Sequence, residues 1–597
     1  MKTKLFFLGA LQFLLLVSAT ANAQKTKATV DYIQYELSED GNATVISSPS
    51  ILNKYRGDIV IPQSIEVDGK TYAVTAIGDD AFDMCNELKR VEVMGAVKRI
   101  GAYAFSNSGL TSLVLHEEDA LKEIGQGAFS GTFALTEFTI PASADVELPI
   151  FQRGEFDCGI ENIYVREGHP TLKDIDGVLF TKDDILVRFP MARQGLYDIP
   201  DGTVGIGDRA FSNSKLSSVG IPESVEDIGS YAFQQSQIGG IDVPNGVKSI
   251  GDYAFSLCSN LTDVTFGETV TSIGEGAFID CIGLTSIDIP NNVSAIGQAA
   301  FSGCINLAFI TIPDKVTTLS QRVFQRCSSL TSVNIPNSVT TIDDYAFYGC
   351  SALTSITIPD NVTAINSWTF RDCKSLTTVI IPNSVTTIGS MAFQGCTALN
   401  SIDIPNSVKT IDDYAFQNCS ALTSIDIPNS VKQVGQAAFG NCSSLTSVSI
   451  SSNLTDIKME TFMGCSGLKS VTIPSSVKSI DIRAFDGCGG LTTIISEIEH
   501  PFEIYGNSSD YRVFDWKTIN YATLWVPEGA VDKYKETEGW KEFAKIKENT
   551  PDGIATPMLK QAEDSPTYDL QGRRMADNQP LHPGVYVKNG RKFVVKE

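Results

Sequence analysis

The sequence repeats itself over much of its length at a fixed interval of 23 residues. A phenylalanine returns at each interval, and a cysteine follows it three positions later. The phenylalanines are Phe255, Phe278, Phe301, Phe324, Phe347, Phe370, Phe393, Phe416, Phe439, Phe462 and Phe485, and the cysteines are Cys258, Cys281, Cys304, Cys327, Cys350, Cys373, Cys396, Cys419, Cys442, Cys465 and Cys488. Units of this size cannot bury an apolar face alone, so they stack on one another. The repeat therefore predicts a solenoid with a long, repetitive surface.

The unit from Cys350 to Cys373 shows how one coil is built. Thr357 lies between two isoleucines of a short extended segment, and strand side chains alternate between faces, so Thr357 is predicted to point outward. Pro359 ends that segment because it has no N–H to donate to a neighbouring strand. The predicted inward positions are Leu353, Ile356, Ile358, Val362, Ile365 and Phe370. Two short strands and a turn leave no room for a crossover helix of ordinary length.

The recurring pattern L-x-x-I-x-I-P…V-x-x-I-G-x-x-A-F-x-x-C resembles the leucine-rich repeat of the treponemal, BspA-like class. The resemblance covers about Val74 to Ile495 and lacks a steady asparagine ladder, since Ser338 stands where Asn361 stands one coil later. It implies a mainly β, leucine-rich-repeat solenoid with coils of ~23 residues, short parallel strands and caps at both ends. It also implies an exported surface protein associated with adhesion to host matrix proteins or to other cells.

Cysteines in an exported protein ordinarily suggest disulfides. Here 12 of the 13 occupy the third position after a repeat phenylalanine, counting Cys85 after Phe82, and Cys158 is the exception. A small apolar residue suits such an inward position, and each thiol would have two equivalent neighbours to pair with. We therefore predict buried, free thiols, with rung-to-rung disulfides as the alternative.

The first 23 residues read as a cleaved secretory signal. Lys2 and Lys4 precede an apolar run from Leu5 to Val17, and Ala21-Asn22-Ala23 is a small-x-small cleavage site. The alternative is an uncleaved membrane anchor, for which the run is short. We predict an exported chain that resides at the cell surface, on the exterior of the outer membrane, or in the medium, without a transmembrane segment.

Composition and motif changes divide the rest of the chain. The predicted segments are a signal peptide at 1–23, an N-terminal cap at 24–73, the solenoid at 74–495 with an irregular insertion at 142–200, a C-terminal cap at 496–550, a linker at 551–566 and a β module at 567–597. Within the insertion, Asp174, Asp176 and Gly177 are interpreted as a turn. A calcium loop is the alternative, but the other acidic positions of such a loop are missing.

Three of the four tryptophans, Trp516, Trp525 and Trp540, fall in the predicted C-terminal cap. We predict that these large rings pack over the last rung, with Trp525-Val526-Pro527 as a last strand and 531–547 as a short helical close. The alternative is an aromatic platform for a sugar.

The final segment contains two extended runs around Asn589-Gly590, which is typical of a two-residue β-hairpin loop. It resembles the C-terminal sorting module of Bacteroidetes type IX secretion substrates, in the short form found in gut members. The resemblance implies an export address, and a structural tail without an export role is the alternative.

No sequence motif points to catalysis or to a cofactor. The four histidines lack partners at ligand spacing, and C-x-x-C, H-E-x-x-H, G-x-S-x-G and Walker A motifs are absent. The net charge of −24 argues against nucleic acid, which needs a basic stripe. We therefore expect a protein that is not an enzyme and needs no cofactor.

A binding role is the remaining expectation, and the outward strand positions are its candidate site. They include Asp242, Asp288, Asn334, Thr357, Asp403 and Asp426. This face is acidic and hydroxyl-rich with few aromatic residues, which suits a basic patch on an extracellular protein better than a sugar. The alternatives are a structural surface-layer protein and a solenoid that binds or degrades glycans.

Overall fold

The computed structural model describes side chains and backbone over most of the chain and the backbone of three short C-terminal strands. The described ranges are 26–49, 54–116, 118–146, 159–506 and 511–549, with the strands at 568–569, 584–588 and 591–595. They form two compact units, the first of Met1–Leu179 with Pro190–Ala192 and the second of Phe180–Phe189 with Arg193–Glu597. The predicted signal peptide, linker, Cys158 and hairpin loop lie outside the described residues.

The first unit begins with an antiparallel sheet that turns into a parallel one. Strands β1, β2 and β3 pair antiparallel, β3 pairs parallel with β6, and β6 pairs parallel with β8. The elements of this unit are β1 (Thr26–Val30), β2 (Ile33–Leu37), β3 (Asn42–Ile46), β4 (Gly57–Ile61), β5 (Ser64–Val67), β6 (Lys70–Ile77), β7 (Leu88–Val93), β8 (Arg99–Ile100), β9 (Ser112–Leu115), η1 (Glu118–Ala120), β10 (Glu123–Ile124), β11 (Glu137–Ile140), β12 (Asp145–Val146), β13 (Asn162–Val165) and β14 (Leu172–Ile175).

Tyr55 closes the apolar interior at the N-terminal end of this unit. Its ring lies 5.0 Å from that of Phe82, which stacks on Phe105. The Tyr55 hydroxyl donates to the carbonyl of Ile46 at 2.8 Å and accepts from the N–H of Gln34 at 2.9 Å. A tyrosine therefore covers the first phenylalanine and still satisfies its buried polar group.

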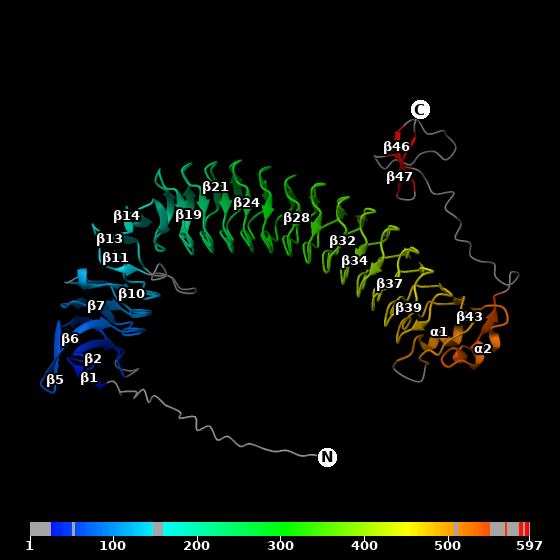
Figure 1. Ribbon diagram of the computed structural model, residues 1–597, viewed down its shortest axis with the longest axis horizontal. Helices are drawn as coiled ribbons and strands as arrows, with labels where there is room; N and C mark the ends of the chain where they lie inside the picture. Colours follow the sequence, from blue (N-terminus) through cyan, green and yellow to red (C-terminus); the bar gives the residue numbers. More distant parts are fainter. Residues whose placement is uncertain are drawn as a thin grey trace, which may run out of the picture. The chain divides into compact units, whose positions relative to one another are not determined.

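The second unit is built from two series of short parallel strands (Figure 1). The first series is β17 (Gln194–Asp198), β19 (Lys215–Gly220), β21 (Gly240–Val243), β23 (Asp263–Phe266), β25 (Ser286–Ile287), β27 (Phe309–Thr311), β29 (Ser332–Asn334), β31 (Ser355–Thr357), β33 (Thr378–Ile380), β36 (Ser424–Asp426), β38 (Ser447–Ser449), β40 (Ser470–Ile473) and β42 (Thr493–Ser496). The second series is β16 (Ile185–Arg188), β18 (Gly205–Ile206), β20 (Asp227–Ile228), β22 (Ser249–Ile250), β24 (Ser272–Ile273), β26 (Ala295–Ile296), β28 (Thr318–Leu319), β30 (Thr341–Ile342), β32 (Ala364–Ile365), β34 (Thr387–Ile388), β35 (Thr410–Ile411), β37 (Gln433–Val434), β39 (Asp456–Ile457) and β41 (Ser479–Ile480). Strand β15 (Val178–Thr181) contains the boundary between the units. The predicted mainly β solenoid with 23-residue coils is confirmed.

The coil of Phe370 follows the predicted pattern. Ile356 and Ile358 are buried and Thr357 is exposed, so the alternation read from the sequence holds in β31. The second strand, β32, places Ile365 inside. Phe370 is completely buried, and its ring centroid lies 5.4 Å from those of both Phe347 and Phe393. The phenylalanines thus form a continuous stack through the coils of this unit.

The cysteines lie beside this stack and donate hydrogen bonds across coils. All 12 described cysteines are free and buried. The Cys350 thiol donates to the carbonyl of Phe324 at 3.1 Å, and the Cys373 thiol donates to that of Phe347 at 3.3 Å. Burial raises the pKa of the Cys304 thiol to about 12, so these groups stay protonated donors. The third position after the phenylalanine therefore suits a small side chain that can donate a hydrogen bond, and not only a small apolar one.

Coils that carry serine at this position define a prediction for Cys350. The hydroxyls of Ser108 and Ser214 are buried without a hydrogen-bond partner. At the same position the Ser236 hydroxyl lies 3.3 Å from the Cys258 thiol, and the Thr132 hydroxyl donates to the carbonyl of Phe105 at 2.8 Å. Cys350→Ala is expected to lower the free energy of unfolding by about 1 kcal/mol, and Cys350→Ser by about 1–3 kcal/mol because it buries an unpaired hydroxyl. Urea unfolding of both variants measures this, and a serine variant more stable than the alanine variant would contradict it.

The backbone of the insertion shows how its acidic segment is folded. Asp176 and Gly177 have φ of 50° and 72°, which is a turn, and the Asp174 carboxylate accepts the N–H of Val165 at 2.7 Å. The interpretation of this segment as a turn therefore agrees with the structure.

The C-terminal cap differs from the prediction in which rings it uses. Phe514, not a tryptophan, continues the stack, with its ring centroid 5.2 Å from that of Phe485. Trp540 is fully buried beyond it, whereas Trp525 is half-buried and Trp516 is 56% exposed. The predicted packing of all three tryptophans over the last rung is therefore wrong for Trp516, which lies on the exposed side of its helix, whereas Thr518 and Ile519 lie on the buried side.

The rest of the cap contains less helix than predicted. Its elements are α1 (Trp516–Tyr521), β43 (Thr523–Val526), α2 (Val531–Glu536), η3 (Trp540–Glu542) and β44 (Ile546–Glu548). β44 pairs parallel with β43, so the strand of Trp525 is not the last one. Beyond the cap, β46 (Gly584–Lys588) pairs antiparallel with β45 (Tyr568–Asp569) and with β47 (Arg591–Val595).

Candidate binding surfaces

The outward positions of the first strand series form one exposed column in the second unit. The six predicted residues, Asp242, Asp288, Asn334, Thr357, Asp403 and Asp426, are all exposed. Parallel pairing brings this column into register, with Asp242 opposite Thr265, Thr311 opposite Asn334, and Asp426 opposite Ser449. Asp288 and Asp403 lie in the equivalent position of coils whose strands are shorter or absent.

The carboxylates of this column keep hydrogen-bonding capacity. Asp242 accepts from the Thr265 hydroxyl at 2.5 Å. Among the described residues, Asp288, Asp403 and Asp426 have no ion-pair partner. The threonines three positions earlier in each coil are used internally, since the Thr377 hydroxyl donates to the carbonyl of Thr354 at 3.1 Å. The acidic side chains of the column are therefore available to a partner, whereas these earlier threonine hydroxyls are not.

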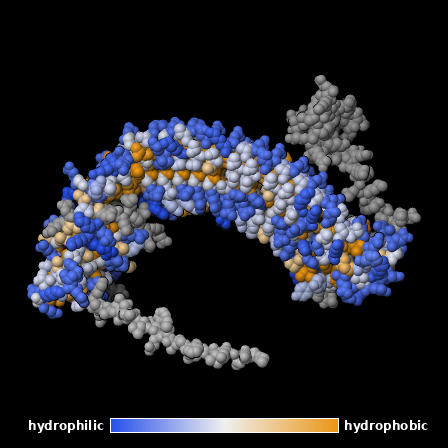
Figure 2. All heavy atoms as spheres, in the orientation of Figure 1, coloured by the Kyte–Doolittle hydropathy of each residue, from blue (hydrophilic) through white to orange (hydrophobic). Residues whose placement is uncertain are grey.

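The surface also carries isolated apolar side chains that sequence reasoning did not single out. Phe309 and Ile380 lie on β27 and β33 and are 51% and 52% exposed. Figure 2 shows the visible face of the coils around β19 to β28 as mostly hydrophilic, with a narrow apolar row along it. Single exposed apolar residues are normal on soluble proteins and do not by themselves indicate a site.

A second repeated feature lies in the turn that carries the phenylalanine. In each of the 16 phenylalanine-marked coils, the residues two before and two after the phenylalanine have positive φ. We call them the preceding and the following positions. Their φ values run from 50° to 63° and from 51° to 75° respectively. This left-handed region favours Gly, Asn and Asp and is costly for larger residues.

The residue types found at the preceding and the following positions differ. The following positions hold Met84, Asn107, Gly131, Asn213, Gln235, Leu257, Asp280, Gly303, Arg326, Gly349, Asp372, Gly395, Asn418, Asn441, Gly464 and Gly487. The preceding positions hold Asp80, Tyr103, Gly127, Arg209, Tyr231, Tyr253, Gly276, Ala299, Arg322, Tyr345, Trp368, Met391, Tyr414, Ala437, Glu460 and Arg483. Gly, Asn or Asp fills 12 of 16 following positions but only three of 16 preceding ones. Large side chains are thus kept at the preceding positions against the backbone preference.

Four successive side chains of the preceding positions meet two further residues, Tyr348 and Arg371, in the middle of the second unit. We call this group, Arg322, Tyr345, Tyr348, Trp368, Arg371 and Met391, the ring cluster. The Tyr345 and Trp368 rings stack with centroids 5.1 Å apart, and Tyr348 meets both edge-on at 6.2 and 6.3 Å. The Arg322 guanidinium lies 5.1 Å from the Tyr345 ring, and that of Arg371 lies 4.0 Å from the Trp368 ring. All six residues are half-buried.

Sequence reasoning missed the ring cluster, although a signal existed. Tyrosine recurs two residues before the phenylalanine in A-Y-A-F and related strings, for example at Tyr253, Tyr345 and Tyr414. The period alone marks this position as repeated. The left-handed backbone, which makes a large residue there unexpected, is visible only in the structure.

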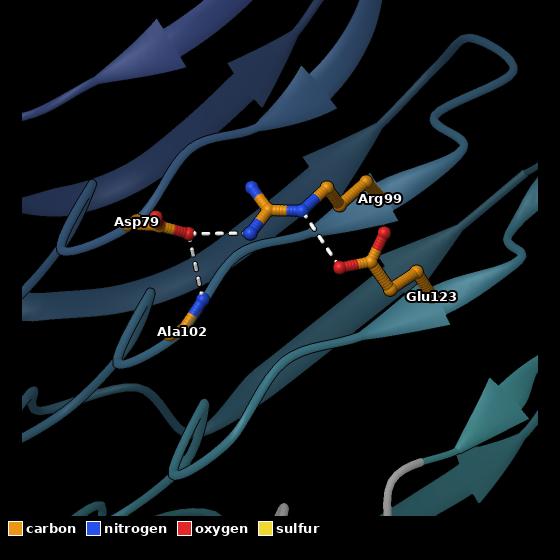
Figure 3. Close-up of polar contacts among 4 residues, drawn as sticks. All are labelled: Asp79, Arg99, Ala102 and Glu123. Carbon is orange, nitrogen blue, oxygen red and sulfur yellow. Dashed lines mark hydrogen bonds and ion pairs between the residues drawn. The ribbon is translucent and has the colours of Figure 1, made fainter.

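A charge ladder joins three successive coils of the first unit (Figure 3). Arg99 lies between Asp79 and Glu123, with Nη2 2.7 Å from the Asp79 carboxylate and Nε 2.9 Å from that of Glu123. Desolvation acts to raise the pKa of Asp79, but hydrogen bonds from Arg99 and from the Ala102 N–H outweigh it and lower that pKa. Asp79, Arg99 and Glu123 bind only residues of neighbouring coils in these interactions, so the ladder serves to hold the coils together.

The described residues contain no further candidate for chemistry. No group of three or more His, Cys, Asp or Glu side chains in these ranges is placed to hold a metal ion. Within the same ranges, no helix has the length and apolar character needed to cross a membrane.

Comparisons with solved structures found the following similar proteins. A leucine-rich repeat protein from Bacteroides ovatus is 23% identical over 76% of this chain and 98% of its own, with a TM-score of 0.38. A leucine-rich cell surface protein from Faecalibacterium prausnitzii is 22% identical over 88% of this chain and 95% of its own, with a TM-score of 0.21. The pneumococcal vaccine antigen PcpA is 15% identical over 88% of this chain and 99% of its own, with a TM-score of 0.32.

No curated protein matches the sequence. The family model described as the BspA type leucine rich repeat region matches residues 63–182, 196–308, 272–400 and 386–502, which is well over half of the chain. These matches contain the phenylalanine stack, the cysteine positions and the strand column. The chain belongs to the BspA-type leucine-rich repeat family.

Proposed function

We propose that this protein is an exported, non-catalytic surface protein that binds a macromolecule on a host or bacterial surface and so mediates adhesion. The observation that carries this proposal is the exposed column of the first strand series, in which polar side chains are held in register from Asp242 to Ser449 in every coil except that of Ile380. A rigid array of this kind matches a partner that offers many weak contacts along a line. A structural surface-layer role is the alternative and would need no such partner.

The proposed partner presents a basic patch. Asp288, Asp403 and Asp426 offer charge without an internal counter-ion among the described residues, and the chain as a whole carries −24. Long-range electrostatic attraction between these carboxylates and a basic partner would speed association and set specificity more than it would add affinity. We therefore infer a basic extracellular protein, such as a matrix protein or a surface protein of another cell, as the partner class.

A double substitution on the strand column tests this proposal. Asp403→Asn/Asp426→Asn is expected to slow association with immobilised matrix proteins by about threefold or more, since rim charges act mainly on the association rate. The matched control is Glu268→Gln/Asp360→Asn, which removes two exposed acids from the turns after the strands. Unchanged association of the first variant, or the absence of saturable binding to matrix proteins, mucins and glycans, would favour the structural role.

We further propose that the C-terminal strands act as a type IX-like sorting module and that the protein originates from a member of the Bacteroidetes. The pairing of β45, β46 and β47 as a small antiparallel sheet supports this, because a separately folded β module can be recognised without disturbing the solenoid. Such a module would direct export of the protein but would not attach it to the membrane.

Deletion of everything after Asn549 tests the address. The truncated chain is expected to keep its solenoid and to remain in the periplasm, as followed by cell fractionation and circular dichroism. If it reaches the surface or the medium in normal amount, the module has no export role.

A further inference from the structure

The ring cluster holds large side chains that the backbone does not favour. Tyr345, Trp368 and Met391 have φ of 61°, 63° and 56°. The following positions of the same three coils adopt the same conformation with Gly349, Asp372 and Gly395. The chain therefore places residues that tolerate this conformation four positions later in each coil and does not do so at Tyr345, Trp368 and Met391. Residues kept in such regions against their preference are common at functional sites.

The faces of the stacked rings are already occupied. Tyr345 lies between the Arg322 guanidinium and the Trp368 ring, and Trp368 lies against Tyr345 with Arg371 also over its ring. An apolar sugar face or a partner's ammonium group needs a free ring face, so neither fits this stack. Tyr345 and Trp368 are nevertheless half-buried and not fully buried, and the edges of such rings carry the positive end of the aromatic quadrupole.

The groups that border these edges are hydrogen-bond donors. The cluster contains two guanidinium groups, two tyrosine hydroxyls and the Trp368 indole N–H. Among the described residues Arg322 has no ion pair, and the only ion pair of Arg371 is with Asp372, at 3.4 Å from Nε. Nη1 of Arg371 also donates to the sulfur of Met391 at 3.8 Å. The nearby acids are partly committed, since the Asp344 carboxylate accepts the N–H of Ser367 at 2.9 Å. The cluster thus offers positive charge and donors in a chain that is otherwise acidic.

We propose that the ring cluster binds an acidic polysaccharide, with its carboxylate or sulfate groups on the Arg322 and Arg371 guanidiniums and its hydroxyls on the ring-edge donors. Guanidinium binds such anions through two parallel hydrogen bonds, and stacking on a ring fixes its orientation. This site uses a different segment of each coil from the strand column and does not depend on the proposed function.

The shape of the cluster favours a linear glycan over a protein. It is one to two residues wide in each coil and spans the coils of Phe324 to Phe393. A protein interface needs roughly 800 Å² on each partner, whereas a few ring edges and two guanidinium groups match a short run of sugar units. Anionic groups repeated along one chain also fit two guanidinium groups that stand on different coils.

Affinity electrophoresis of the full-length chain in native gels tests the proposal. Dextran sulfate in the gel is expected to retard the protein, and unmodified dextran at the same concentration is expected not to. Arg322→Gln/Arg371→Gln should weaken the apparent affinity for dextran sulfate about tenfold or more, because each charged hydrogen bond lost is worth about that factor. Retardation should also fall steeply with added salt.

Matched variants separate a site from general charge and from folding. Arg209→Gln/Arg483→Gln removes two arginines from other preceding positions and is expected to keep the affinity within twofold of the unsubstituted chain. Trp368→Asn supplies a residue that tolerates the left-handed backbone, so it should bind about tenfold more weakly while its Tm stays unchanged or rises.

Four results would each overturn the proposal. They are equal retardation by dextran, unchanged affinity of Arg322→Gln/Arg371→Gln, an equal loss in Arg209→Gln/Arg483→Gln, and binding of poly-glutamate as tight as that of dextran sulfate. The last would assign the cluster to acidic peptides. If Trp368→Asn loses Tm but keeps its affinity, the rings serve only to pack the coils.

Discussion

Phe370→Ala is expected to lower the free energy of unfolding by about 3–5 kcal/mol. The ring is fully buried and contacts the rings of the coils on both sides, so its removal leaves a cavity that the stack cannot close. Contacts in a solenoid are made mainly between neighbours, so the loss should be felt most in the coils of Phe347 and Phe393. Hydrogen exchange along the chain measures both the size and the reach of the effect.

Thr357→Ala in the same coil is the control, because Thr357 is exposed on the strand column. Its effect on stability should stay within about 0.5 kcal/mol. Uniform loss of protection across all coils in Phe370→Ala would show that the solenoid unfolds as one unit and would contradict the nearest-neighbour description.

Trp540→Ala is expected to cost about 3–5 kcal/mol and to expose the C-terminal end of the solenoid. Trp540 packs against Phe514 at 6.0 Å and Tyr534 at 5.3 Å, and its indole N–H donates to the carbonyl of Phe502 at 2.9 Å. Without it, Phe514 keeps only Phe543 as a ring neighbour in the cap, so exchange should rise first in the coils of Phe485 and Phe462. Tryptophan fluorescence with hydrogen exchange follows this fraying.

Trp516→Ala provides the comparison, since Trp516 is 56% exposed and has one ring neighbour, Tyr521. It should leave the exchange of the last coils unchanged. Equal destabilisation by the two tryptophan substitutions would mean that the cap is held together by surface contacts and not by its buried ring.

The fold could be predicted from the sequence because the same pattern of apolar and polar residues recurs in many coils. The alternation around Thr357 and the period of Phe370 each recur in coil after coil, so chance matches are excluded and burial follows directly. The mainly β solenoid is confirmed for this reason. The exposure of the six strand-column residues follows from the same alternation, whereas their partner stays a prediction.

The sequence was weaker where a residue occurs once or where the backbone departs from strand geometry. Trp516, Trp525 and Trp540 look equivalent in the sequence, and only tertiary neighbours decide that Trp540 is core and Trp516 is not. Phe514 lies outside the 23-residue interval, so its place on the stack was not predicted. The ring cluster was missed because nothing in Tyr345 or Trp368 announces a left-handed backbone, for which glycine is the usual signal.

The turn around each phenylalanine has a polarity that runs along the solenoid. In the second unit the N–H groups of Arg209, Phe211 and Asn213 all donate forward, to carbonyls of Ser230, Ala232 and Gln234 in the next coil. Later coils repeat this direction, so the peptide dipoles of this segment add up as they do in a helix, with the positive end toward the C-terminus.

The last coil therefore ends in N–H groups that need acceptors. The cap supplies them, since the carbonyls of Arg512 and Val513 accept from the N–H groups of Arg483 and Phe485 at 2.8 and 3.0 Å. Because this turn donates in the same direction in successive coils of the second unit, coils can be gained or lost between the ends without changing what the terminal segment must provide to the turn. The number of coils is thus free to vary, while the two ends of the stack are not interchangeable.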